Sequence, residues 1–121
     1  MDPSEPSPSP VVYKKHLSEP WFTLIKLGIK TCEARVCKDM WKDINVGDTL
    51  IFVNNDLGFQ RSIRLIVSNI NFYPDFHTYL ENEGLQNCLP GMDNMNIGVT
   101  VYRKYYTVEE EQFYGIVCFN F

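Results

Sequence analysis

Alternating apolar and polar residues predict a series of short β-strands along this chain. Strands are expected over 11–17, 31–36 and 49–53, where β-branched and aromatic residues are frequent. Residues 61–70 alternate basic or polar with aliphatic side chains and are expected to form one long strand. The run 114–121 is almost continuously apolar, which is typical of a central closing strand.

Two or three short helices are expected between these strands. The first has Pro20 in its first turn, where a missing N–H does no harm, and ends at Gly28. The second spans 74–81, and a third starts at Thr107, which forms a capping box with Glu110. The apolar residues on the inner face of the second helix are Phe76, Tyr79 and Leu80. The pattern predicts an α+β domain with five to six strands on a curled sheet or small barrel.

The length of the chain fits a single domain at 11–121. Residues 1–10 contain four prolines and three serines and are expected to be a disordered tail, because they offer little apolar surface to bury. No apolar run reaches the roughly 18 residues that a membrane-spanning helix needs, and the N-terminus does not resemble a signal peptide. We expect an intracellular monomer, cytoplasmic or nuclear, without a membrane segment.

The four cysteines and two histidines do not form a metal-binding pattern. No C-x-x-C pair is present, and the histidines lie far apart in the sequence, so neither a metal nor another cofactor is expected. Free thiols without a signal peptide are typical of a reducing compartment.

Charge is unevenly distributed along the chain. Residues 11–42 carry seven Lys or Arg against three acids, whereas 43–121 carry four against ten. Proteins that grip a long duplex usually have a strong basic excess, and this chain has a net charge of −4. The positive first third favours a short or single-nucleotide ligand.

The segment 28–35 gathers three ionisable side chains. Side chains alternate along a strand, so Glu33 and Arg35 share one face, and Lys30 can reach them from the preceding turn. The opposite face of this strand is small and apolar, as a core face should be. The arrangement predicts a polar ligand site at the mouth of the domain.

This order of residues, G-x-K-x-x-E-x-R, resembles the signature of ASCH domains, which are PUA-like β-barrels. The motifs Val46-Gly47-Asp48, Leu89-Pro90-Gly91 and Gly115-Ile116-Val117 add to the resemblance, which covers 11–121 in the manner of a small single-domain member. The resemblance implies a cleft that holds RNA, a nucleotide or a modified nucleoside. Some members hydrolyse the acetyl amide of acetylcytidine, others have been described as ribonucleases, and larger members belong to transcription coactivators.

The catalytic residues that the resemblance implies are Lys30, Glu33 and Glu83. Acetylcytidine amidohydrolases have a threonine where this chain has Glu33, and their further glutamate is expected near Glu83. From the residues alone, Lys30 in a desolvated cleft beside Arg35 could act as a general base. If Lys30 pairs with Glu33, it instead binds a phosphate or a base carbonyl. An ion-pair cluster that only closes one end of the barrel is the third possibility.

Aromatic side chains near the motif are candidates for stacking on a base. Tyr105 and Tyr106 follow the basic pair Arg103-Lys104, and Trp21 opens the first helix, where packing in the core competes with ligand contact. His16 ends the first strand and completes the ligand-binding candidates.

Three functions follow for this chain. The first is a binding module for RNA, a nucleotide or a modified nucleoside. The second is a hydrolase of a modified nucleoside or of RNA. The third is a transcription-related adaptor that uses the acidic two-thirds and the N-terminal tail.

Overall fold

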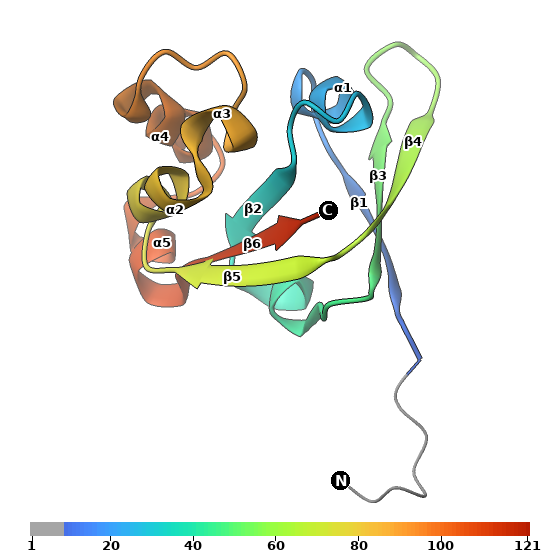
Figure 1. The fold of residues 1–121 in the computed structure, drawn as a ribbon, viewed down its shortest axis with the longest axis horizontal. Helices are drawn as coiled ribbons and strands as arrows, with labels where there is room; N and C mark the ends of the chain where they lie inside the picture. Colours follow the sequence, from blue (N-terminus) through green and yellow to red (C-terminus); the bar gives the residue numbers. More distant parts are fainter. Residues whose placement is uncertain (1–8) are drawn as a thin grey trace, which may run out of the picture.

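The computed structural model of the chain describes residues 9–121, and the predicted tail lies mostly outside them. The first of two three-stranded sheets has the order β1-β3-β4 (Figure 1). It contains β1 (Val12–His16), β3 (Thr49–Asn54) and β4 (Arg61–Ile66). β1 runs parallel to β3, whereas β3 and β4 form an antiparallel hairpin.

The second sheet has the order β2-β6-β5 and is antiparallel throughout. It contains β2 (Cys32–Val36), β6 (Ile116–Asn120) and β5 (Asn69–Tyr73). The closing strand is therefore central, as its continuous apolar sequence predicted. β1 and β2 are each at the edge of their sheet, and a cleft lies between these two edges.

The predicted long strand over 61–70 is wrong, because the chain changes sheets in its middle. β4 ends at Ile66 and β5 begins at Asn69. Between them, Val67 N donates to Asp48 O at 2.9 Å in the first sheet, and Ser68 N donates to Asn120 O at 2.8 Å in the second. Continuous alternation in the sequence does not reveal which partner strand each half will find.

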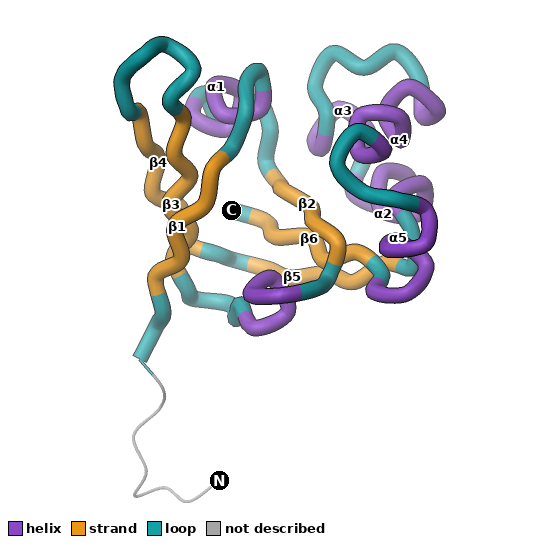
Figure 2. Tube along the Cα trace, turned by 180° about the vertical axis from the view of Figure 1, so that it is seen from behind, coloured by secondary structure: helices purple, strands orange, loops and turns teal. Residues whose placement is uncertain are grey.

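Helices are more numerous than the two or three predicted. Within residues 9–121 there are five α-helices and one 3₁₀ helix, namely α1 (Trp21–Lys26), η1 (Asp39–Asp43), α2 (Phe76–Glu83), α3 (Leu85–Cys88), α4 (Met95–Arg103) and α5 (Val108–Tyr114). None of them is long and apolar enough to cross a membrane. α2 to α5 gather on one side of the second sheet, and the first sheet lies on the other side (Figures 1 and 2).

Several helix signals in the sequence are confirmed. The capping box between Thr107 and Glu110 is present, and all three predicted inner residues of α2 are buried. Gly28 follows α1 with φ of +76°, a conformation that glycine adopts without a steric penalty. α4 was not predicted, because its β-branched residues favour strands locally, although Asn94 provides a side-chain cap to Ile97 N.

The core lies on both faces of the second sheet. Cys32, Ala34 and Val36 of β2 pack against α2 to α4, which confirms the predicted apolar face. The alternate residues of β6, Val117 and Phe119, pack against side chains of the first sheet. All four cysteines are free thiols.

Candidate functional site

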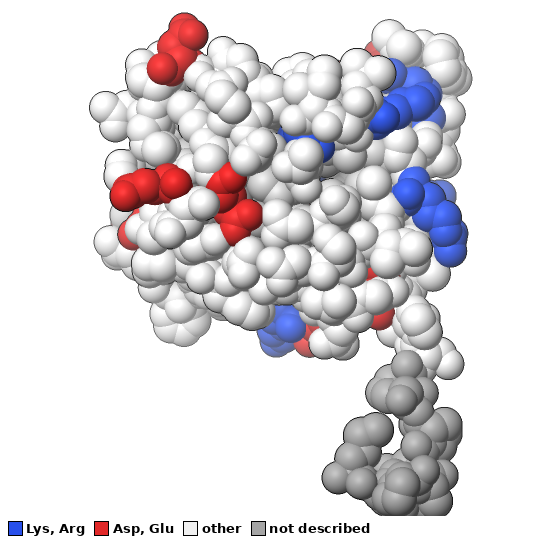
Figure 3. All heavy atoms as spheres, in the orientation of Figure 1, with Lys and Arg blue, Asp and Glu red and all other residues white. Residues whose placement is uncertain are grey.

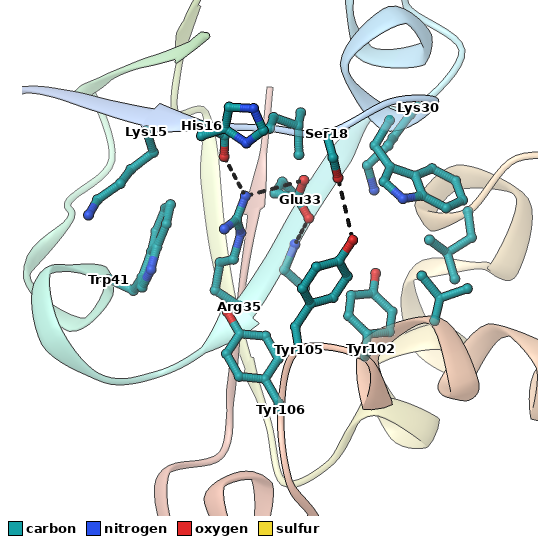
Figure 4. Close-up of a pocket in the computed structure, with 15 residues that line it drawn as sticks. Lys15, His16, Ser18, Lys30, Glu33, Arg35, Trp41, Tyr102, Tyr105 and Tyr106 are labelled. Atoms are coloured by element: carbon teal, nitrogen blue, oxygen red, sulfur yellow. Dashed lines mark hydrogen bonds and ion pairs between the residues drawn. The ribbon is translucent and has the colours of Figure 1, made fainter. Parts of the chain in front are cut away.

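A cleft of about 390 Å³ opens between the edge strands β1 and β2 (Figure 4). Its walls also come from α1, η1, α4 and the segment between α4 and α5. Seven of the residues proposed from the sequence meet here: His16, Trp21, Lys30, Glu33, Arg35, Tyr105 and Tyr106. The structure thus brings together every proposed ligand-binding residue, although they are spread over 90 positions of sequence.

Lys30 and Glu33 form the buried inner part of the cleft, with only 2% and 5% of their surfaces exposed. The end of α1 fixes Lys30, because the backbone N–H groups of Ile29 and Lys30 both donate to Leu24 O at 3.0 Å. The Lys30 ammonium donates to the carbonyl oxygen of Cys88. Glu33 accepts a hydrogen bond from Ala34 N at 3.0 Å. Lys30 and Glu33 make no ion pair within 4.0 Å of each other, although both belong to the described residues.

Arg35 lies at the outer part of the cleft, where it bridges the two edge strands. Its Nη2 atom is 3.5 Å from the carbonyl oxygen of His16 and 3.9 Å from Glu33 Oε2. Its guanidinium carbon is 4.6 Å from the centroid of the Trp41 ring, a cation–π distance. Lys15 lies near the same ring, with Nζ 6.0 Å from the centroid.

Aromatic rings form the remaining walls. Tyr105 is 61% exposed, and its hydroxyl lies 3.5 Å from Ser18 Oγ across the mouth of the cleft (Figure 4). Tyr106 stacks on Phe76 at 5.9 Å, and burial raises the pKa of its phenol. Trp21 lines the cleft and also packs against both halves of the core, with Lys30 Nζ 5.7 Å from its ring centroid. Tyr105 is therefore the aromatic ring most open to a ligand.

Glu83 does not line the cleft. It ends α2 on the helix-covered face of the second sheet, where its carboxylate accepts hydrogen bonds from Asn71, Tyr73 and Asn120. The alternation of β2 explains the separation, because Cys32 points to the face that Glu83 occupies and Glu33 points into the cleft.

One cluster has the residue types of a metal site. The sulfur atoms of Cys32 and Cys118 and a carboxylate oxygen of Glu83 lie within 4.8 Å of one another. Three protein donors already bind Glu83, and both thiols are fully buried. The cluster is accounted for as part of the folded interior.

Three of the polar and aromatic residues that line the cleft were not proposed from the sequence, namely Lys15, Ser18 and Trp41. Trp41 lies in η1, six residues after Arg35, and no periodic pattern connects the two. Lys15 could have been noticed, because it precedes His16 on the same edge strand. Tyr102 is almost fully buried and stacks on Phe76 at 4.3 Å, so it forms the back wall.

Comparison with known proteins agrees with this geometry. The ASCH domain model matches residues 16–121. The crystal structure of the hypothetical protein PH0355 has a TM-score of 0.81 and 34% identity, over 91% of this chain and 96% of that one. The solution NMR structure of protein PF0455 from Pyrococcus furiosus has a TM-score of 0.73 and 34% identity, over 91% and 94% of the two chains. Among proteins of curated function, none matches the sequence. With its signature residues gathered in one cleft, the chain belongs to the ASCH domain family of the PUA-like superfamily.

Proposed function

We propose that the cleft binds a nucleotide-sized ligand, either a nucleotide or modified nucleoside or one unit of single-stranded RNA. The observation that carries this proposal is the pair of buried side chains at its inner end. Lys30 has more protons than its one acceptor uses, and Glu33 has acceptor capacity beyond its bond from Ala34 N. Each group already has a partner within the protein, and a ligand with both donors and acceptors can use the capacity that is left.

The edge of a nucleobase presents such donors and acceptors, and its faces stack on aromatic rings. Tyr105 and Trp21 supply rings beside Lys30 and Glu33. A volume of about 390 Å³ lies at the small end of the usual range for ligand pockets. This size suits one nucleotide and excludes a duplex.

We also infer that the two sheets together form a curled, open barrel, with the cleft at its open seam. Residues of both sheets share one core, with Leu50 and Phe52 of β3 packed in the same cluster as Val117 and Phe119 of β6. The chain turns directly from β4 into β5 on one side. On the opposite side, the seam between β1 and β2 is where the cleft lies.

Hydrolysis of a modified nucleoside is the second candidate. It is favoured by the burial of Lys30 and Glu33 in one cleft, since a lysine and a carboxylate are a usable base and orienting group there. Glu83 lies behind the sheet, so any catalysis in this cleft would depend on Lys30 and Glu33.

A ligand titration with a product assay tests both candidates. Nucleosides including acetylcytidine, mononucleotides and short single-stranded RNAs are titrated by NMR, and the same samples are analysed by mass spectrometry. Lys30→Met and Glu33→Gln are expected to weaken binding roughly 10- to 100-fold, the value of a charge-assisted hydrogen bond. Lys26→Met is the matched control, because Lys26 is exposed on α1 and does not line the cleft.

The outcomes separate the two functions. Binding without product supports the binding module, and product that disappears with Lys30→Met supports the hydrolase. If no ligand class shifts resonances of the cleft, or if Lys26→Met weakens binding as much as Lys30→Met, the proposal is wrong.

A further inference from the structure

The outer part of the cleft has an excess of positive charge. Lys15, His16 and Arg35 line it together, and Glu33 is the one acid among the lining residues. On the face drawn in Figure 3, basic side chains lie mainly over the first sheet and acidic ones mainly over the helices. The cleft therefore has two chemically different ends, a mixed donor and acceptor end at Lys30 and Glu33 and a cationic end at Lys15 and Arg35.

Arg35 is held in place but retains hydrogen-bonding capacity. The cation–π contact with Trp41, at 4.6 Å from the guanidinium carbon to the ring centroid, holds the guanidinium without using its N–H groups. Its contacts to His16 O at 3.5 Å and to Glu33 Oε2 at 3.9 Å are both long and involve the same Nη2 atom, and the phenol of Tyr106 is a further polar neighbour. A guanidinium that lies over an aromatic ring and has spare N–H groups is well suited to a phosphate, which it can bind through two oxygens.

Lys15 lies near the same tryptophan ring as Arg35 (Figure 4). Within residues 9–121, no carboxylate lies within 4.0 Å of its ammonium group. Its neighbour Lys14 is exposed and does not line the cleft, as the alternation of β1 requires. Lys15 and Arg35 are thus two cations near one ring. Among the described residues, Lys15 has no carboxylate within 4.0 Å, and Arg35 has only the long 3.9 Å contact to Glu33 Oε2, so together they can hold an anion.

We propose that Lys15 and Arg35 form a phosphate subsite, so that the preferred ligand is a phosphorylated nucleotide unit rather than a free nucleoside. The inference rests on the proposed function, and it adds an orientation. The base lies toward Lys30 and Glu33, and the phosphate lies beside Trp41 between Lys15 and Arg35. A free mononucleotide and an RNA strand both offer this phosphate.

The experiment compares ligands that differ only in the phosphate. Each nucleoside is titrated by calorimetry or NMR beside its 5′- and 3′-monophosphates, at low and at physiological salt. At low salt the preferred monophosphate is expected to bind about tenfold more tightly than its nucleoside, since one charge-assisted contact contributes that much. Added salt is expected to reduce this gain, because the outer subsite is partly exposed.

Variants of β1 provide the matched control. Lys15→Gln is expected to remove most of the phosphate gain and leave nucleoside affinity unchanged, whereas Lys14→Gln is expected to keep the gain. Unfolding temperatures of both variants show whether they fold. Dinucleotides without a terminal phosphate, whose one phosphate is the internal phosphodiester, show where the bound phosphate comes from. If they bind with the same gain as the monophosphates, the ligand is an RNA strand. If only the monophosphates show the gain, the ligand is a mononucleotide or the end of a strand.

Failure of this inference is distinguishable from failure of the proposed function. If nucleosides bind and the phosphate adds nothing, or if Lys14→Gln and Lys15→Gln lose the gain equally, the phosphate subsite is wrong and the nucleotide-sized cleft stands. If neither nucleosides nor nucleotides bind, both proposals are wrong.

Discussion

Glu111 links α5 to α2 and α4 through hydrogen bonds, beside the segment that carries the cleft residues Tyr105 and Tyr106. This acid is buried at the first turns of α5, with 4% of its surface exposed. One of its oxygens accepts from Phe76 N at 2.9 Å, which satisfies a free N–H at the start of α2. Arg103 at the end of α4 donates to both oxygens, at 2.8 and 3.1 Å. Tyr105 and Tyr106 lie in the segment that connects α4 to α5.

Glu111→Ala is expected to destabilise the fold substantially. Leaving the buried N–H of Phe76 without an acceptor costs about 1–3 kcal/mol. Loss of the Arg103 pair adds about 1 kcal/mol, because 32% of the arginine side chain is exposed and solvent weakens the pair. The sum is about 2–4 kcal/mol. For a domain of this size, each kcal/mol lowers the unfolding temperature by roughly 4 °C, so we expect a decrease of about 8–16 °C.

Differential scanning calorimetry measures this decrease, with Glu109→Ala as the control. Glu109 is exposed in the same first turn, so its loss removes only a favourable interaction with the helix dipole, worth under about 1 kcal/mol. NMR spectra of Glu111→Ala are expected to show shifted resonances at Tyr105 and Tyr106. Unfolding temperatures of the two variants that agree within about 3 °C would refute the reasoning, because the buried acceptor would then contribute no more than an exposed acid.

Two further predictions concern a carboxylate and a glycine. The N–H of Thr78 donates to Asp75, the cap of α2, and lowers the pKa of Asp75 below 3.8. A lowered pKa stabilises the fold above pH 3.8, and this contribution is lost as the pH falls through the folded value. Asp75→Asn keeps a capping side chain but loses the charge. Its unfolding temperature should therefore lie below that of the wild type at pH 7 and converge with it by about pH 2, where the wild-type carboxyl is protonated. A difference that stays constant with pH would contradict this. Gly115→Ala places a Cβ 3.1 Å from Tyr73 O at φ of +71°. Calorimetry should find it more destabilising than Gly58→Ala, which shares the positive φ but has no atom within 4 Å of the new Cβ, and equal losses would exclude the contact as a cause.

The sequence predicted local features well, because they depend on neighbours along the chain. The alternation of β2 separated the core residue Cys32 from the cleft residue Glu33, and the structure agrees. The capping box of α5 and the glycine that follows α1 were also predicted correctly, because each of these signals depends only on a few neighbouring residues.

The tertiary structure decided which distant residues meet. Trp41 joins Arg35 only because η1 folds back beside β2, and Lys15 reaches the same ring because β1 is an edge strand. Glu83 belongs to the opposite face of the second sheet, a placement set by the packing of α2 and not by its sequence distance from Lys30. The sequence by itself determined the family signature and the faces of its strand, because period and spacing are local. The cleft required the folded chain, because its walls come from separate elements whose contacts depend on how the two sheets and the helices pack.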